Sequence, residues 1–213
     1  MSLQIKICGM RERENIEQIS SLMPDYLGFI FYSASLRYVG NDFSLDWFKQ
    51  KKGSIKTVGV FVNHDFNFIQ EQLEKQEFDV IQLHGSEDPE FCAELKKQFK
   101  DTLIWKAFAV DGSFEFSSLA DYRESCEAYL FDNKWTAPGG SGESFDWSLL
   151  ENYVSDKSLI LSGGIGLDNI EKAVFTAGQD LRIKVMDINS KAEISPGIKS
   201  AEIVSELIKK VRT

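Results

Sequence analysis

Eight short apolar runs, rich in β-branched and aromatic residues, recur along the chain and predict eight buried β-strands. These runs are Leu3–Ile7, Tyr26–Phe31, Thr57–Val62, Val80–Leu83, Leu103–Phe108, Ala128–Phe131, Ser158–Leu161 and Ile183–Ile188. Most are separated by stretches with apolar residues at three- and four-residue spacing, which predict helices: Glu14–Leu22, Phe66–Glu74, Glu90–Phe99, Asn169–Ala177 and Ala201–Val211. Because such strands alternate with helices, a parallel sheet covered by helices is indicated.

Eight strand–helix units favour a closed (β/α)8 barrel, the TIM barrel, as one α/β domain over residues 1–213. An open doubly wound sheet is the rival, but a glycine fingerprint is then expected after the first strand. The first predicted strand instead leads into Cys8-Gly9-Met10. A chain of 213 residues is short for a barrel, so its helices and loops must be economical.

The formal net charge of -9 disfavours nucleic acid as a partner, because a duplex binder needs a basic face. The sequence has no apolar stretch of membrane-spanning length and no signal-peptide pattern, so we expect a cytoplasmic protein without a membrane partner. With two histidines, and three scattered cysteines that form no CxxC pair, we expect no metal site. We also expect no cofactor.

The carboxyl ends of the strands carry the active site in a (β/α)8 barrel, so residues just after each apolar run deserve separate inspection. Polar residues or glycines occur at nearly every such position: Cys8, Arg37, Asn63, Gln82, His84, Asp132, Ser162, Asp187 and Ser190, with glycines after the sixth and seventh strands. Each alone has an ordinary structural explanation, such as a buried thiol, a surface ion pair or a turn cap. Their regular placement favours a common site.

Gly163 and Gly164 follow the seventh predicted strand, at the position where these barrels recurrently bind phosphate. Glycines there allow backbone N–H groups to approach a ligand closely. A phosphorylated small-molecule substrate is therefore the expected partner, although a steric need for glycine at the strand–helix junction is the alternative.

The residues at these strand ends resemble the phosphoribosylanthranilate isomerase family in order and spacing. The matching segments are Lys6–Met10, Gly28–Phe31, Ser35–Val39, Val58–Asn63, Gln82–Gly85, Phe131–Asp132, Gly139–Gly142, Phe145–Trp147, Leu161–Ile165, Asp187–Ser190 and, after Glu193, Pro196–Lys199. The resemblance runs from the first strand to the last helix, and this collinearity is far more specific than any single motif. It implies a barrel of the ribulose-phosphate-binding type.

The resemblance further implies an aldose–ketose isomerase of tryptophan biosynthesis that converts N-(5-phosphoribosyl)anthranilate to 1-(2-carboxyphenylamino)-1-deoxyribulose 5-phosphate. This is an Amadori rearrangement by general acid–base catalysis. By position in the family motifs, Asp132 is the general acid that protonates the furanose ring oxygen. Cys8 is the general base that removes the proton from the sugar C2.

The same resemblance assigns the substrate-binding residues. Arg37 is expected to bind the anthranilate carboxylate, for which a planar guanidinium is suited. Gly163, Gly164 and Ser190 are expected at the phosphate, while Gln82 and His84 are expected at the mouth, orienting sugar hydroxyls. The glycines at 139–142 are expected in a loop that folds over the substrate and excludes water.

The two catalytic groups place opposed demands on their surroundings, because Asp132 must hold a proton near neutral pH and Cys8 must lose one readily. A dry pocket favours protonated Asp132. Lys6 lies two residues before Cys8, on the same strand face, and could lower the pKa of the thiol. An ion-paired lysine of the barrel core is the favoured interpretation of Lys6.

Lys191 departs from the family pattern, which commonly has glycine after the position of Ser190. A side chain there is strained if φ is positive, although its ammonium group could contact the phosphate. The alternatives to the isomerase are another phosphosugar barrel enzyme, such as indole-glycerol-phosphate synthase, and a noncatalytic phosphosugar-binding barrel. The sequence leaves monomer and homodimer both open.

Overall fold

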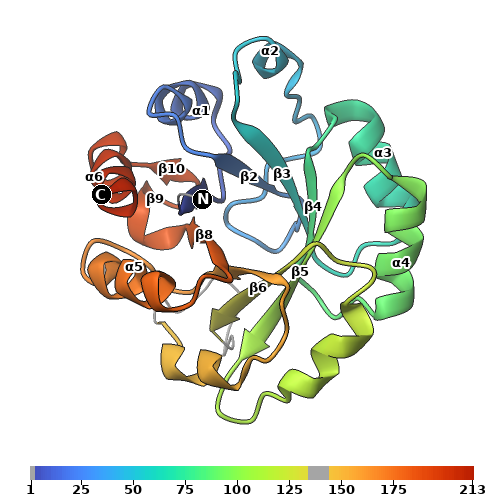
Figure 1. The fold of residues 1–213 in the computed structure, drawn as a ribbon. Coiled ribbons are helices and arrows are strands. Elements are labelled where there is room, and N and C mark those ends of the chain that lie inside the picture. The colour runs from blue at the N-terminus through green and yellow to red at the C-terminus, as the bar shows by residue number, and fades with distance from the viewer. Residues whose placement is uncertain (1–2, 134–143) are drawn as a thin grey trace.

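The computed structural model describes residues 3–133 and 144–213. Its centre is a closed barrel of eight parallel strands, in which each strand pairs with the next and β8 pairs with β1 (Figure 1). The strands are β1 (Gln4–Ile7), β2 (Tyr26–Ile30), β3 (Lys56–Phe61), β4 (Val80–Leu83), β5 (Leu103–Val110), β6 (Ala128–Asn133), β7 (Ser158–Leu161) and β8 (Ile183–Ile188). The predicted (β/α)8 barrel and all eight predicted strands are confirmed.

Helices cover the outside of the barrel, and the five predicted from periodicity are present (Figure 1). They are α1 (Arg13–Ser20), α3 (Phe66–Gln76), α4 (Pro89–Gln98), α5 (Ile170–Gln179) and α6 (Ala201–Arg212). Side chains of Asp65, Asp88 and Ser200 accept hydrogen bonds from the first turns of α3, α4 and α6. Such caps satisfy N–H groups that a helix leaves without partners.

Three connections replace a full helix by a short one. They are α2 (Asp46–Lys49), after β2, and the 3-10 helices η1 (Phe116–Tyr122) and η2 (Trp147–Asn152), after β5 and β6. After β8 the chain adds the 3-10 turn η3 (Ser190–Ala192) and a two-stranded hairpin of β9 (Glu193–Ser195) and β10 (Ile198–Lys199). These short helices keep the connections brief, as expected for a chain that is short for a barrel.

Alternate residues of the strands face the two sides of the barrel wall, as strand geometry dictates. The inner cluster includes Tyr26, Trp105 and Leu130, and the larger outer cluster lies between strands and helices. Toward the carboxyl ends of the strands, buried inward positions become polar, as at Lys6, Gln82 and Asp187. The barrel therefore has an apolar body and a polar carboxyl end.

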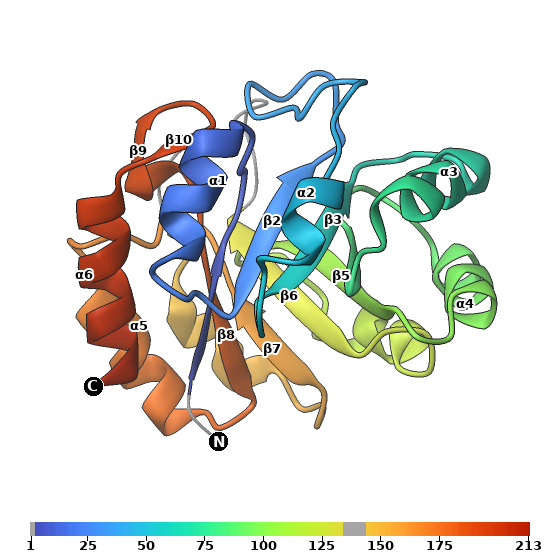
Figure 2. The ribbon, with the colours of Figure 1, turned by 90° about the horizontal axis from the view of Figure 1, so that it is seen from above.

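Figure 2 shows the start of β1 and the end of α6 toward one end of the barrel, and the long connection between β2 and α2 at the other end. None of the helices in the described ranges is long and apolar enough to cross a membrane.

Candidate active site

The carboxyl end of the barrel contains a closed cycle of polar contacts between side chains from five strands or the residues just after them. Its members are Lys6, Gln82, His84, Asp132, Ser162 and Asp187. We call this set the polar cycle. It contains three of the predicted site residues and joins elements from opposite ends of the sequence.

One half of the polar cycle starts at the buried ammonium group of Lys6. Its Nζ donates to Gln82 Oε1 at 2.8 Å and to Asp187 Oδ1 at 2.9 Å. The Nε2 of Gln82 then contacts His84 Nδ1 at 2.8 Å. Gln82 is fully buried, with both ends of its amide engaged by these neighbours.

The other half of the polar cycle surrounds the carboxyl group of Asp132. Its Oδ2 lies 3.5 Å from His84 Nε2 and 3.4 Å from Ser162 Oγ. The same hydroxyl lies 3.3 Å from Asp187 Oδ2. The backbone N–H of Asn133 donates to Asp132 Oδ1 at 2.7 Å. The carboxyl group is thus held in one orientation by groups on three strands.

Cys8 lies at the end of β1 with its side chain against Lys6, and only 4% of the residue is exposed. Gly28 on β2 provides the space, because a Cβ there would lie 2.9 Å from Cys8 Sγ. Burial raises the pKa of the Cys8 thiol, and the nearby Lys6 ammonium only partly opposes this effect. In the unliganded protein the balance of these effects therefore favours the protonated thiol.

Lys6 is an ion-paired lysine of the barrel core, as the favoured interpretation predicted. Burial lowers its pKa, but the charge of Asp187 and the neighbouring Cys8 outweigh burial, and the net pKa lies above the ordinary value. Lys6 therefore keeps its proton and presents a permanent positive charge to the thiol.

Arg37 lies in the connection after β2 and forms a bidentate ion pair with Glu193 of β9. Its Nε and Nη2 donate to the two carboxylate oxygens at 2.8 and 2.7 Å. Glu193 also accepts from the buried Lys199 Nζ at 2.7 Å, and Lys199 donates to Asn189 Oδ1 at the same distance. This second charged cluster joins the β2 connection to the hairpin and fixes the plane of the guanidinium.

The glycines after β7 adopt the left-handed conformation, with φ of 88° at Gly163 and 58° at Gly164. A Cβ at Gly163 would lie 2.9 Å from Asp132 Oδ1, so glycine there is needed for close packing against the predicted acid. Asn169 closes the following turn by accepting from Gly166 N and donating to Gly164 O, both at 2.9 Å.

Ser190 begins the turn η3 beyond β8, and Lys191 follows it. Lys191 is not among the residues with positive φ, so the condition for backbone strain is not met. Its Nζ lies 2.6 Å from Asp168 Oδ2, an ion pair that links the β8 turn to the segment after β7. The possible contact of Lys191 with phosphate stays a prediction.

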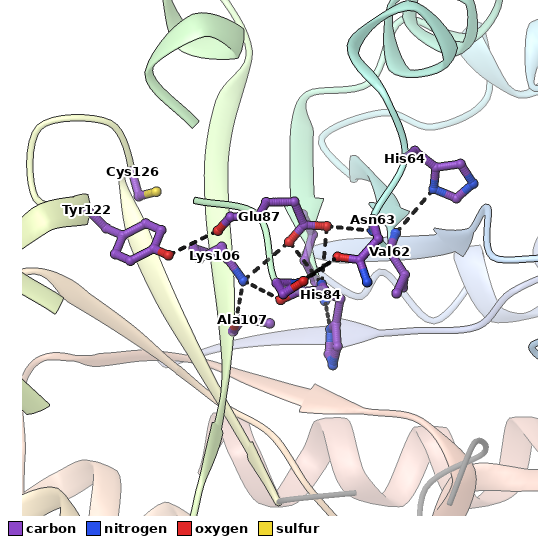
Figure 3. Close-up of polar contacts among 12 residues, drawn as sticks. Val62, Asn63, His64, His84, Glu87, Lys106, Ala107, Tyr122 and Cys126 are labelled. Carbon is purple, nitrogen blue, oxygen red and sulfur yellow. Dashed lines mark hydrogen bonds and ion pairs between the residues drawn. The ribbon is translucent and has the colours of Figure 1, made fainter. Parts of the chain in front are cut away.

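A further polar cluster supports the loop that carries His84 (Figure 3). Glu87 accepts hydrogen bonds from the backbone N–H groups of Asn63 and Gly85, and it lies 3.3 Å from Lys106 Nζ. Lys106 in turn donates to the carbonyl oxygens of Gly85 and Ala107, each at 2.8 Å. We call Glu87 and Lys106 the loop anchor, since they fasten the ends of β3 and β4 to β5.

Four residues of these clusters have no role predicted from the sequence, although the last two occur among the residues that carry the family resemblance: Glu87, Lys106, Glu193 and Lys199. A lysine within an apolar strand is an unusual choice, and this signal could have marked Lys106. The predicted glycine loop at 139–142 lies outside the described residues. Within the described ranges, no cluster of three or more typical metal-binding side chains occurs.

The chain is similar to known proteins over nearly its whole length. A family model described as N-(5'-phosphoribosyl)anthranilate (PRA) isomerase matches residues 5–210. A protein of that name from Parabacteroides distasonis is 35% identical over 208 residues, which cover 97% of this chain and 92% of the relative.

Solved structures agree with this result. The phosphoribosyl anthranilate isomerase of Thermotoga maritima is 31% identical to this chain, and the match covers 98% of each chain with a TM-score of 0.84. A second structure describes monomers generated from that dimeric protein. It is 28% identical, with 98% coverage of each chain and a TM-score of 0.77. Another structure, 27% identical with a TM-score of 0.78 and 98% coverage of each chain, is a complex with reduced 1-(o-carboxyphenylamino)-1-deoxyribulose 5-phosphate. The chain therefore belongs to the phosphoribosylanthranilate isomerase family and is an isomerase of tryptophan biosynthesis.

Proposed function

We propose that this chain converts N-(5-phosphoribosyl)anthranilate to 1-(2-carboxyphenylamino)-1-deoxyribulose 5-phosphate with Asp132 as the general acid and Cys8 as the general base. The observation that carries this assignment is the polar cycle. It holds the carboxyl group of Asp132 and the ammonium group beside Cys8 at the same end of the barrel. This is the end where barrel enzymes perform their chemistry.

The reaction begins when Asp132 gives its proton to the furanose ring oxygen. The bond between C1 and that oxygen breaks as the nitrogen lone pair forms an iminium ion. The Cys8 thiolate then takes the proton from C2, and those electrons form a C1–C2 double bond while neutralising the iminium nitrogen. The resulting enolamine takes up a proton at C1 and loses its C2 hydroxyl proton, which gives the ketone without net gain or loss of atoms.

The electrostatics of the free protein agree with a base that is activated only during turnover. Burial holds the Cys8 thiol protonated, with the charged Lys6 against it. The iminium ion adds a second positive charge beside the thiol, which favours the thiolate and the release of the thiol proton to solvent before C2 is deprotonated. Ring opening by the acid therefore prepares the base for the second step.

Substrate binding would use the flanking clusters. Arg37, oriented by Glu193, would bind the anthranilate carboxylate, and a rigid guanidinium plane suits bidentate contact. Gly163, Gly164 and Ser190 would bind the phosphate, because left-handed glycines present N–H groups to an anion. We propose His84 near the reacting groups, since its ring lies beside Asp132.

The test is turnover of freshly generated substrate, followed by its fluorescence decay, in wild type, Cys8→Ala and Asp132→Ala. Rapid wild-type conversion with losses of about 100-fold or more in both variants supports the acid–base pair. Binding of the phosphosugar without wild-type conversion would instead indicate a noncatalytic barrel. Arg37→Lys should raise KM, because an ammonium group does not bind a carboxylate in bidentate fashion.

We further propose that residues 1–213 act as one catalytic domain, since the predicted site draws on both ends of the chain. Because the polar cycle closes within one chain, we propose that a monomer suffices for catalysis even if the protein dimerises as the Thermotoga maritima relative does. The test is a dilution series that spans any dimer dissociation, across which the specific activity should stay constant.

Three free, buried cysteines agree with the predicted cytoplasmic location.

A further inference from the structure

The hydrogen bonds of the polar cycle fix the protonation of His84, and the reasoning starts at Lys6. An ammonium group has three donors and no acceptor. Lys6 Nζ lies 2.8 Å from one end of the Gln82 amide, so that end must be the carbonyl oxygen. The opposite end, the NH2 group, is then directed at His84 Nδ1 at 2.8 Å. Since this NH2 can only donate, Nδ1 must be an acceptor and carry no proton.

A neutral imidazole with a bare Nδ1 carries its proton on Nε2. This nitrogen lies 3.5 Å from Asp132 Oδ2, on the side of the ring that faces the predicted acid. We propose that Lys6 and Gln82 are positioning residues that hold His84 as the neutral Nε2–H tautomer, so that its N–H supports the Asp132 carboxylate formed on proton transfer. Gln82 thereby acts through His84 and does not bind the sugar hydroxyls.

The backbone at and after His84 is also held by hydrogen bonds. Its N–H donates to the Phe61 carbonyl oxygen at 2.8 Å, and the following residue, Gly85, is fastened through both its N–H and its carbonyl to the loop anchor (Figure 3). The ring is therefore oriented from one side by Gln82 and from the other by its own loop. A donor that must meet a developing charge without rearrangement needs this kind of support.

The direct test is long-range ¹H–¹⁵N NMR of protein labelled with ¹⁵N-histidine at neutral pH and without ligand. The chain has two histidines, so a His64→Gln variant assigns both sets of signals. We expect His84 to show a bare Nδ1 and a protonated Nε2. An Nδ1–H tautomer or an imidazolium ion would overturn the proposal.

A single-atom exchange tests the cause. In Gln82→Glu the carboxylate accepts from Lys6 as before but also accepts from His84, so Nδ1 should become protonated. If Nδ1 stays bare in this variant, Gln82 does not set the tautomer and the proposal fails. These NMR results do not depend on which residue is the acid, so they stand apart from the proposed reaction.

The kinetic test compares two buried glutamines. Gln82→Met removes the amide of the polar cycle, while Gln76→Met removes an amide of similar burial that instead bonds to Leu45 N in the outer layer. Gln82→Met should lower kcat about tenfold or more with little change in KM, and Gln76→Met should change neither. A raised KM with normal kcat would show that Gln82 binds substrate, contrary to the proposal.

Discussion

Two buried lysines near the mouth of the barrel, Lys6 and Lys199, have equally inaccessible side chains but opposite electrostatics. The pKa of Lys6 is raised, because its own partner Asp187 and the nearby Cys8 more than offset burial. Burial lowers the pKa of Lys199 to about 8, and Glu193 only partly opposes this because the carboxylate is shared with Arg37. The balance of charges around a buried group, more than burial itself, decides its protonation.

Because the pKa values of the two lysines shift in opposite directions, the two clusters have different roles. The Lys6 cluster has one ammonium group for one carboxylate, and it keeps a fixed charge beside the predicted base. Among the residues that the structure describes, the Lys199 cluster brings two cations, Lys199 and Arg37, to the carboxylate of Glu193.

The largest effect is expected for Lys6→Met, which leaves Asp187 buried without its cation. We predict a loss of about 3–5 kcal/mol in the free energy of unfolding, measured by urea titration. Lys199→Met is the matched control, because Glu193 keeps its bidentate pair with Arg37, and its loss should be smaller, about 1–3 kcal/mol. Equal losses would contradict the comparison.

The second prediction concerns pH. The folded pKa of Lys199, about 8, lies below the ordinary value of 10.5, so its protonation weakens the fold, and this penalty disappears as pH rises from about 8 toward 10.5. The stability of wild type relative to Lys199→Met should therefore increase across this window, by about 3 kcal/mol at most. The raised pKa of Lys6 keeps its contribution complete below 10.5, so the same difference for Lys6→Met should stay flat there. Urea titrations at several pH values separate the two.

The third prediction uses the space beside the thiol. In Gly28→Ala the new Cβ would lie 2.9 Å from Cys8 Sγ and 3.0 Å from Lys6 Cε. We expect a loss of about 1–3 kcal/mol in unfolding free energy together with slower turnover. Gly178→Ala in α5 meets nothing within 4 Å and should instead stabilise the protein by about 0.5–1 kcal/mol. Unchanged turnover in Gly28→Ala would show that the thiol tolerates displacement.

The smallest effect is expected for a third lysine that stays in contact with water. The ion pair of Lys191 with Asp168 has side-chain exposures of 27% and 64%, and Lys191→Ala should cost less than about 1 kcal/mol in unfolding free energy. If the ammonium group contacts phosphate, the same variant raises KM and weakens inhibition by inorganic phosphate. Asp168→Asn, which releases Lys191 from its partner, should then have the opposite effect on KM.

The barrel could be predicted from the sequence because its strands are continuous apolar runs whose chemistry is local. The coverings α2, η1 and η2 could not, since segments of four to seven residues are too short to show helical periodicity. Cys8 and Asp132 could also be selected from the sequence, because each directly follows a predicted strand. The contacts around these two residues could not be predicted. The pairing of Lys6 with Asp187, for example, joins positions 181 residues apart, and a local sequence pattern does not record such a pair.

The pairing of β1 with β8 also has a consequence for folding. The ammonium group of Lys6 acquires its carboxylate only when the last strand closes against the first, so a chain that ends before Asp187 has no complete site. Contacts between such distant positions form late, because the intervening loop must first be ordered. The recovery of enzymatic turnover during refolding therefore reports barrel closure. It should be slower than the recovery of the helical signal in circular dichroism.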